Sequence, residues 1–231
     1  MAEKGSTTAK NGKHTRGRGR PVLEAEFDTR EALLRAAHEL LAERGSLQVS
    51  ITDICERAGI NVAMVHYHFG NKRGMLITLF ERMCAKWAVE LEHLMELDVK
   101  PTRKLELHVS QMIRNYRRAP YTTRLMTEVV GLSTASSARR LGGSFVKPLT
   151  DFYRQLIVEG VAAGEFREID PEFLFFSIVG ACEFFFSTKN LVRPSSRNRN
   201  GNESIEVAFG QHTIDMLLKG MVTQETTLAK C

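Results

Sequence analysis

Apolar residues recur every three or four positions along most of the chain, and this is the spacing of an amphipathic helix. The first such stretch, 28–44, has Leu33 and Leu40 on one face, and Asp28 with Glu31 forms the pattern of a capping box at its start. Further helices are predicted at 50–58, 62–69, 71–99, 102–118, 122–131, 138–163, 171–189 and 204–222. No strand-like alternation of useful length appears, so the sequence predicts an all-α fold.

Two prolines refine these boundaries. Pro148 lies inside the 138–163 segment, where a missing backbone donor and a bulky ring predict a kink or a helix boundary. Pro171 follows Asp170, and this pair is typical of a helix start with proline in the first turn. The polar stretch 192–203 between the last two helices predicts a mobile loop.

Two of the predicted helices are short and nearly adjacent. Ser50 can cap the first, with Asp53 three residues on, and Gly59 ends it. Asn61 is a good cap for the second, so a turn of only three residues separates the two helices. Two short helices joined in this way are typical of a helix-turn-helix unit.

The second helix of this pair has two different sides. At about 100° per residue, Val65 faces a core while Ala63 and Tyr67 point the opposite way. His66 and His68 lie about 200° apart around the same helix, so they cannot chelate one metal ion. No serine or cysteine nucleophile has an obvious histidine and carboxylate pairing. The sequence therefore predicts no metal, no cofactor and no catalytic site.

The positive charge of the protein is concentrated at one end. Residues 1–20 hold six of the 32 basic side chains and one of the 27 acidic ones, so this segment accounts for the whole net charge of +5. The segment is rich in Gly, Ser and Thr and nearly devoid of apolar residues, which predicts a flexible basic arm over 1–26. The rest of the chain is neutral overall.

Composition excludes several other classes. Hydrophobic residues make up 43% of the chain, which is enough for a core. The basic N-terminus lacks an apolar stretch behind it, and the longest apolar run, 173–186, is interrupted by Glu183, so we expect a cytoplasmic protein without a membrane partner. The four cysteines are far apart and form no C-x-x-C pair, which predicts buried thiols.

The segment 50–76, SITDICERAGINVAMVHYHFGNKRGML, resembles the DNA-binding domain of the TetR family of bacterial transcriptional regulators. The Ser-capped helix, the Ala-Gly turn, the Tyr-x-Phe ending and the Asn-Lys that opens the next helix are all in register. The resemblance implies a helix-turn-helix domain over 27–75 and a helical ligand-binding and dimerisation domain over 76–231. It also implies a homodimer, most often a repressor, that binds a near-palindromic site on double-stranded DNA.

The resemblance assigns DNA contacts residue by residue. Ser50, Thr52 and Lys72 are expected to contact phosphates near helix N-termini, which favour anions. Tyr67 and His68 resemble the phosphate contacts of the family. The residues expected near base edges, together with the capping Asn61, are Val62, Ala63, Met64 and His66. Many relatives have tyrosine where His66 stands, and the apolar run 62–64 replaces a polar one, so the operator sequence cannot be predicted.

The basic arm carries a signal of its own. The segment Arg18-Gly19-Arg20-Pro21 resembles an AT-hook core, in which glycine lets the backbone enter a narrow minor groove between two arginines. We expect Arg18 and Arg20 to contact DNA there. The alternative is a solvated basic tail that attracts DNA without reading it.

The second domain is expected to bind a small, largely apolar effector. The candidate pocket residues are Trp87, His108, Met112, Glu128, Phe176 and Glu183. Two rival functions remain open at this point. An architectural minor-groove protein would use the arm and prefer A·T-rich DNA without symmetry, and a small-molecule enzyme would use His108 or Glu183 and show turnover.

Overall fold

The computed structural model describes residues 22–131, 135–191 and 204–222, and this part of the chain is all-α, as the apolar spacing predicts. The helices of the first half are α1 (Val22–Arg44), α2 (Ile51–Ala58), α3 (Val62–Phe69), α4 (Lys72–Glu96) and α5 (Pro101–Arg118). Those of the second half are α6 (Thr122–Gly131), α7 (Ala135–Leu141), the π-helical turn η1 (Gly142–Val146), α8 (Lys147–Ala162), α9 (Pro171–Thr188) and α10 (Ile205–Met221).

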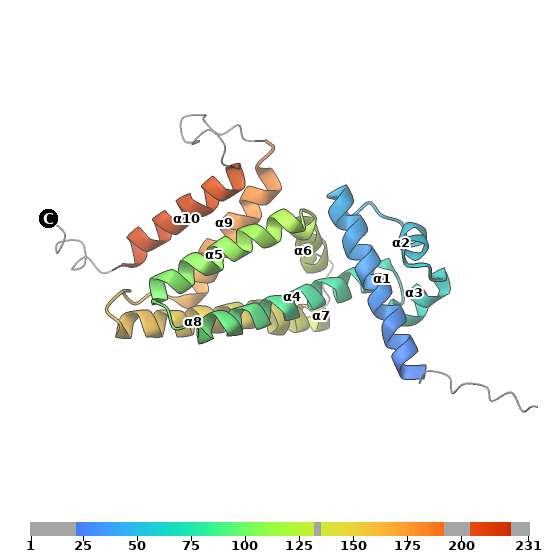
Figure 1. The fold of residues 1–231 in the computed structure, drawn as a ribbon, viewed down its shortest axis with the longest axis horizontal. Coiled ribbons are helices and arrows are strands. Elements are labelled where there is room, and N and C mark those ends of the chain that lie inside the picture. The colour runs from blue at the N-terminus through green and yellow to red at the C-terminus, as the bar shows by residue number, and fades with distance from the viewer. Residues whose placement is uncertain (1–21, 132–134, 192–203, 223–231) are drawn as a thin grey trace, which may run out of the picture.

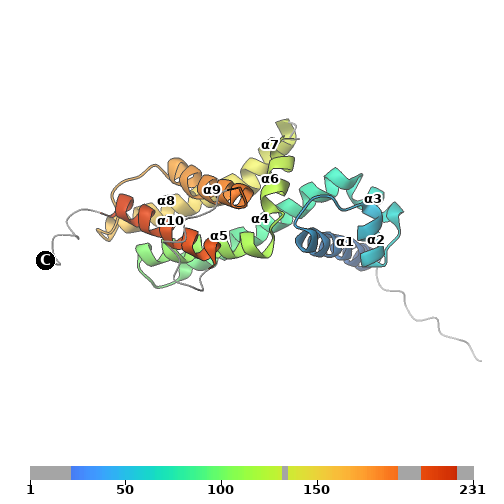
Figure 2. The ribbon, with the colours of Figure 1, turned by 90° about the horizontal axis from the view of Figure 1, so that it is seen from above.

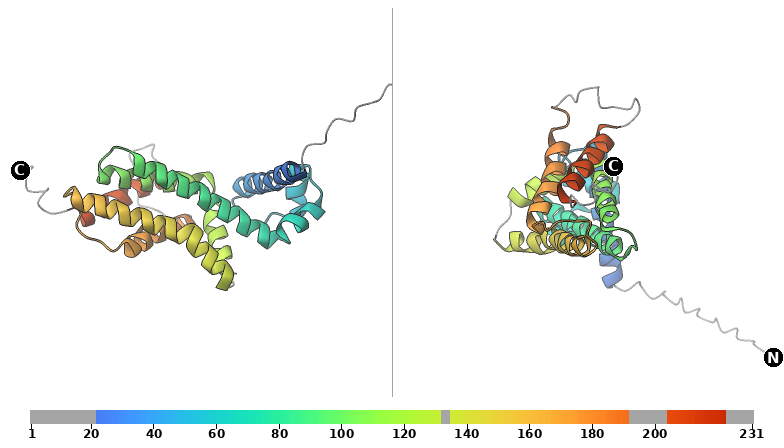
Figure 3. Two further views of the ribbon diagram at one scale, coloured as in Figure 1. Left: turned by 90° about the horizontal axis from the view of Figure 1, so that it is seen from below. Right: turned by 90° about the vertical axis from the view of Figure 1, so that its left-hand side faces the viewer.

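The molecule has a small head and a larger body joined by one long helix. Figure 1 shows α1, α2 and α3 together at one end and α5 with α8, α9 and α10 at the other. The head packs onto the beginning of α4, and the rest of α4 packs against α5 and α8. The view from above (Figure 2) and the view from below (Figure 3) both show α4 passing from the head into the body. Any change in the tilt of α4 therefore moves the head relative to the body.

Most predicted boundaries agree with the structure, but the start of the first helix was wrong. We expected Asp28 to cap that helix, whereas α1 begins at Val22 and Asp28 lies within it. The prediction for Pro148 is confirmed, because η1 ends one residue before α8 begins and Pro148 lies in the first turn of α8. The prediction for Asp170 is also confirmed, since its side chain accepts from the N–H groups of Glu172 and Phe173 at the start of α9.

Two main groups of buried side chains hold the fold together. The head core is built from α1, α2, α3 and α4. It also includes Tyr121, which precedes α6, and Leu125 and Val129 of α6. The body core joins α4, α5, α8, α9 and α10. Phe145 of η1 packs against both groups, with ring centroids 5.6 Å from Phe80 of the head core and 6.1 Å from Phe175 of the body core.

Helix α9 is apolar on opposite sides. By length and composition alone it could cross a membrane, although a single helix of this kind is weak evidence for a membrane protein. One side, with Ile178 and Cys182 at its centre, is buried in the body. The other side exposes Phe173, Phe176 and Phe184, each to more than two thirds of its surface. A monomer leaves this second apolar side in contact with water.

The cysteines within the described ranges are buried thiols. Cys55, Cys84 and Cys182 are free and buried, while Cys231 lies outside these ranges. Burial raises the pKa of both Cys84 and Cys182 to about 12. Both therefore stay protonated at neutral pH, which suits a role in packing rather than in redox chemistry.

Candidate nucleic-acid interface and ligand cavity

The two short helices of the head are fixed by local hydrogen bonds. The Ser50 hydroxyl accepts from the Asp53 N–H at 3.0 Å, and the Asp53 carboxylate accepts from the Ser50 N–H at 3.3 Å, which completes a capping box. Gly59 ends α2 with φ of 66°, a left-handed conformation that suits glycine. The Asn61 side chain then accepts from the Ala63 N–H at 2.8 Å and starts α3. The helix-turn-helix geometry expected from these caps is present.

One side of α3 is buried and the other faces water. Val65 is fully buried in the head core and fixes the rotation of the helix. Val62, Ala63, His66 and Tyr67 are exposed, and Tyr67 exposes 67% of its surface. Thr52 and the capping residues Ser50 and Asn61 are also exposed. This exposed side is the candidate interface for the major groove.

Three other residues that we expected to contact DNA are less exposed to solvent. Met64 is partly buried against the head core. His68 is also partly buried, and its Nε2 has no hydrogen-bond partner among the residues that the structure describes. The Lys72 ammonium donates to the Leu47 carbonyl at 2.9 Å, which leaves two of its three N–H donors for a phosphate. These residues border the exposed side of α3.

The basic side chains of the head are balanced by acidic ones, with six of each over residues 28–75. Arg57 donates to both carboxylate oxygens of Glu43, at 2.8 and 2.9 Å, and Arg44 pairs with Asp53 at 2.9 Å. Because the charges balance and these two arginines are paired with carboxylates, the head is close to neutral overall. Arg18 and Arg20, which we expected to contact DNA, lie outside the described ranges.

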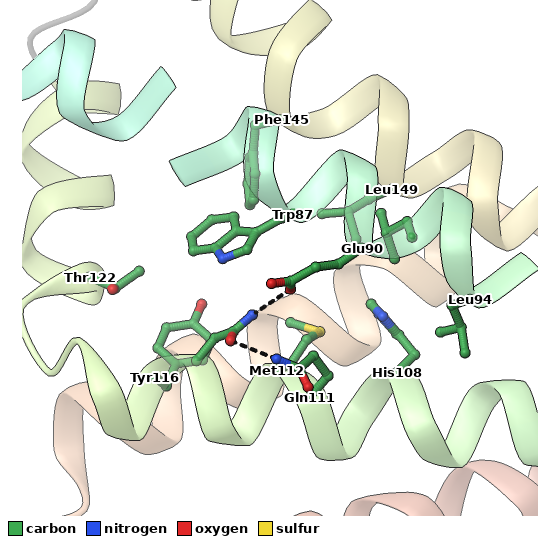
Figure 4. Close-up of a pocket in the computed structure, with 12 residues that line it drawn as sticks. Trp87, Glu90, Leu94, His108, Gln111, Met112, Tyr116, Thr122, Phe145 and Leu149 are labelled. Carbon is green, nitrogen blue, oxygen red and sulfur yellow. Dashed lines mark hydrogen bonds between the residues drawn. The ribbon is translucent and has the colours of Figure 1, made fainter. Parts of the chain in front are cut away.

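A cavity lies in the body between α4 and α5 and is closed by η1 and the beginning of α8. Its empty space, counted out to its opening, is about 590 Å³, although the centre of a water-sized sphere can move through only about 70 Å³ of it. The space open to a ligand is therefore small. The lining residues are Trp87, Glu90, Leu91, Leu94, His108, Gln111, Met112, Asn115, Tyr116, Thr122, Phe145 and Leu149. Figure 4 shows Trp87 and Tyr116 toward one end, His108 and Leu94 toward the other, and Glu90 between them.

The structure places the six expected pocket residues in different locations. Trp87, His108 and Met112 line the cavity. Glu183 lies behind the wall, where its carboxylate accepts from the Tyr116 hydroxyl at 2.9 Å. Glu128 is exposed on α6, and Phe176 belongs to the exposed side of α9.

A short chain of hydrogen bonds forms the polar wall of the cavity. The Gln111 side-chain amide donates to the Asn115 oxygen at 2.9 Å, and the Asn115 amide donates to the Glu90 carboxylate at 3.3 Å, as the dashed lines in Figure 4 show. Our sequence reasoning missed Glu90, Asn115 and Tyr116. The available signal was the single carboxylate at position 90, three residues after Trp87 and thus on the same face of its helix.

His108 contributes to the wall as a neutral ring. Its Nε2 lies 2.8 Å from the Tyr153 hydroxyl in the body core. Burial lowers the pKa of His108 to about 3, so the imidazole carries no charge at neutral pH. Burial of the Tyr116 hydroxyl raises the pKa of Tyr116, and the nearby carboxylate of Glu183 raises it further.

The cavity adjoins the head through the α5–α6 junction. Thr122 lines the cavity, and its neighbour Tyr121 is fully buried in the head core. The Tyr121 hydroxyl lies 2.6 Å from His38 Nδ1 on α1, and the two rings pack edge to face with centroids 5.8 Å apart. Arg124 donates to the Gly45 carbonyl at 3.1 Å and forms a second bridge from α6 to the head.

Comparison with protein-family models gives two matches. Residues 33–79 match the model described as "Bacterial regulatory proteins, tetR family". Residues 98–226, more than half of the chain, match the model described as "Tetracyclin repressor-like, C-terminal domain". The first match covers the helix-turn-helix, and the second covers every helix that lines the cavity except α4.

Relatives and solved structures agree with these matches. The chain is 30% identical to the HTH-type transcriptional repressor NicS of Pseudomonas putida over 169 residues, which are 70% of this chain and 77% of that protein. It is 26% identical to the HTH-type transcriptional regulator BetI of Rhizobium meliloti over 102 residues, or 44% of this chain and 50% of that protein. Its fold matches that of FadR from Bacillus subtilis in complex with stearoyl-CoA, with a TM-score of 0.60, 20% identity, and coverage of 82% of this chain and 98% of that one.

Proposed function

Because the chain belongs to the TetR family of bacterial transcriptional regulators, which are not enzymes, we propose that it binds a near-palindromic DNA operator as a homodimer and represses transcription until a small, largely apolar effector releases it. Regulators of this family bind DNA and small-molecule ligands. The proposed place of action is the cytoplasm. The observation that carries the proposal is the exposed side of α3, held by a head whose core extends to the edge of the cavity.

The exposed side of α3 would enter the major groove. Val62 and Ala63 offer only apolar contacts, such as those to thymine methyl groups, whereas His66 can hydrogen-bond to a base edge. Tyr67 on this surface and Lys72 at its border would contact phosphate oxygens. Specificity for the operator sequence would then come from few polar side chains. The fit between the shape of α3 and the major groove would contribute the rest.

The exposed apolar sides of α8 and α9 support the proposed homodimer. Phe173, Phe176 and Phe184 of α9 and Val158 of α8 are exposed together on neighbouring helices. Contact of this surface with its copy would remove the phenylalanine rings from water, which is favourable by about 1.5–3 kcal/mol for each side chain fully buried. A two-fold interface of this kind would set the distance between two α3 helices.

The dimer proposal can be tested by placing a charge on this surface. Phe176→Glu should convert the dimer to a monomer in light scattering coupled to size-exclusion chromatography. Met216→Glu is the matched control, because Met216 is 61% exposed on α10, outside the proposed interface. An unchanged mass for Phe176→Glu would refute this interface.

The proposed response to the effector passes from the cavity to the head. An effector between α4 and α5 would press on Trp87 of α4 and on Tyr116 and Thr122 at the α5–α6 end. A shift of α4 would change the separation of the two heads, and each head must meet a half-site about one helical turn of DNA, or a multiple of it, from the other. The effector acts in this way only if it binds one separation more tightly than the other.

The basic arm would supply much of the salt-dependent affinity, because the head has equal numbers of basic and acidic side chains. We expect that deletion of residues 1–20 lowers the slope of log affinity against log salt concentration. An unchanged slope would remove the arm from the mechanism, and a preference for A·T-rich flanks that is lost with the deletion would support a minor-groove role for Arg18 and Arg20.

The decisive test of DNA recognition is selection of bound duplexes from a random library by the full-length protein at near-physiological salt. An inverted repeat with a fixed spacer would support the proposal. Enrichment of A·T-rich DNA without symmetry would favour an architectural protein that uses the arm, and an absence of enrichment would contradict specific recognition. His66→Ala should change the selected sequence, whereas Met216→Ala should not.

A further inference from the structure

We propose that the cavity between α4 and α5 selects a slim organic amine in its protonated form, with an apolar or aromatic tail, and that Glu90 receives the ammonium group. The inference names the chemical class of the effector, so its regulatory consequence rests on the function proposed above. Its basis is the charge, hydrogen bonding and shape of the cavity wall.

The charge of the wall favours a cation. Among the cavity-lining residues that the structure describes, Glu90 is the only Asp, Glu, Lys or Arg. The single histidine, His108, has a pKa lowered by burial to about 3 and is therefore neutral. Arg114, the nearest arginine along α5, is exposed and is held by Gln111. An anionic ligand would thus meet a carboxylate and find no cation in the wall.

Glu90 is held in place with acceptor capacity to spare. The Asn115 amide donates to Glu90 Oε2 at 3.3 Å, and Asn115 is itself fixed by the Gln111 amide at 2.9 Å. Glu90 Oε1 accepts no hydrogen bond from other side chains in the described ranges. A half-buried carboxylate with one open oxygen suits an ammonium donor, since charge-assisted hydrogen bonds are about twice as strong as neutral ones.

The aromatic side chains around Glu90 favour the same ligand class. The Tyr116 hydroxyl donates its proton to Glu183, so its oxygen can only accept a further hydrogen bond from a ligand. The rings of Trp87 and Phe145 lie with centroids 6.4 Å apart and form an apolar end to the cavity. Aromatic faces attract cations and also pack against apolar tails. A protonated amine satisfies both the acceptors and the rings.

The small open volume limits the size of the ligand. Water-sized spheres can move through only about 70 Å³, although the empty space extends to about 590 Å³. A single ring on a short chain fits this outline better than a fused-ring system. A suitable probe set is 3-phenylpropylamine, 3-phenylpropanol and 3-phenylpropanoate, which share one skeleton and differ mainly in charge.

The chain provides its own reporter of occupancy. Trp87 is the only tryptophan of the protein, and it lines the cavity. Titration of the full-length protein with each probe at pH 7 should therefore change the tryptophan fluorescence as the cavity fills. We expect the amine to bind at least about tenfold more tightly than the alcohol, and the carboxylate to bind most weakly. Equal binding of amine and alcohol, or tighter binding of the carboxylate, would overturn the inference.

Two variants test the role of Glu90 directly. Glu90→Gln keeps the shape and the acceptor for Asn115 but removes the charge, so the preference for amine over alcohol should fall to about twofold or less. Glu92→Gln is the matched control, because Glu92 is exposed on the same helix outside the cavity, and it should keep the full preference. Glu90→Asp, which keeps the charge, should retain an amine preference. An amine preference that survives in Glu90→Gln would refute the assignment.

The same probes separate this inference from the proposed function. If the amine binds in the cavity but leaves operator affinity unchanged, the ligand class holds and the proposed effector response fails. If the protein binds an inverted repeat but none of the probes changes the Trp87 fluorescence, the ligand class fails and the DNA-binding proposal stands.

Discussion

Two histidine–tyrosine hydrogen bonds lie in very different parts of the molecule. In the body core, His108 and Tyr153 lie 2.8 Å apart and both are buried. At the junction with the head, His38 and Tyr121 lie 2.6 Å apart, with Tyr121 buried but His38 exposed. The same pair of groups is therefore buried in one region and partly open to water in the other. If the His108–Tyr153 hydrogen bond breaks, its polar atoms are left buried without a partner. If the His38–Tyr121 hydrogen bond breaks, water can replace the lost partner of His38.

The pKa values of the two histidines reflect this difference. Burial lowers the pKa of His108 from its ordinary 6.5 to about 3. The pKa of His38 is also lowered, first by the partial burial of its ring against Tyr121 and then by the nearby Arg82. The body bond is suited to holding the cavity wall rigid, and the junction bond is suited to rearranging when the head moves.

Removing the body bond should have the largest effect on stability. Tyr153→Phe leaves His108 Nε2 without a partner in the dry core, and we expect a loss of about 1–3 kcal/mol in the free energy of unfolding. Urea unfolding followed by circular dichroism at fixed protein concentration measures it. Tyr121→Phe is the comparison, and an equal or larger loss there would contradict the contrast between the two regions.

The second-largest effect should be on the pH dependence of the free energy of unfolding, which distinguishes His108 from His38. Between pH 6.5 and about 3 the unfolded chain binds a proton at His108 that the folded chain does not, so the free energy of unfolding falls as the pH falls. This contribution reaches about 1.4 kcal/mol per pH unit. His108→Gln should therefore lose stability less steeply than the wild type between pH 6 and pH 5. The contribution of His38 is common to both proteins, and parallel slopes would show that His108 titrates normally.

The smallest effect on stability should come from the junction bond. Tyr121→Phe should lower the free energy of unfolding by less than about 1 kcal/mol, because water can reach His38. Under the proposed function, however, it should reduce the change in operator affinity that a bound ligand causes. The measurement is the ratio of operator dissociation constants with and without 3-phenylpropylamine.

Arg124→Ala is the control for the junction. It removes an exposed hydrogen bond to the Gly45 carbonyl that also connects α6 to the head. We expect it to change stability by less than about 0.5 kcal/mol and to leave the ligand response intact. A ligand response that is unchanged in Tyr121→Phe, or lost in Arg124→Ala, would show that His38 and Tyr121 do not form the connection.

The head could be predicted from the sequence because its signals are local. Ser50, Asn61 and Asn71 each accept a backbone hydrogen bond from a residue two or three positions on. Such caps depend on few neighbours, so residue type and spacing are enough. The start of α1 was missed because residues 22–27 contain no glycine or proline, and the helix continues through them past the capping signal at Asp28.

The cavity could be predicted only in part because it is built from distant segments. Trp87, His108 and Met112 face it, but the helical pattern that suggested them also suggested Phe176 and Glu128, which face solvent. Which side of an apolar helix meets a neighbour depends on how the helices cross. The contact between Tyr116 and Glu183 joins residues 67 positions apart, and no sequence periodicity encodes it.

The close packing at Gly74 ties the end of α3 to the first turn of α4. A Cβ atom at this position would collide with the carbonyl oxygen of Phe69, so the end of α3 lies directly against the first turn of α4. Helix α4 has 25 residues and is therefore about 37 Å long. A tilt of about 5° at its body end displaces its head end by roughly 3 Å, close to the rise of one base pair along DNA. Leverage of this kind would allow a small ligand to change the fit of α3 to its groove without distorting the head itself.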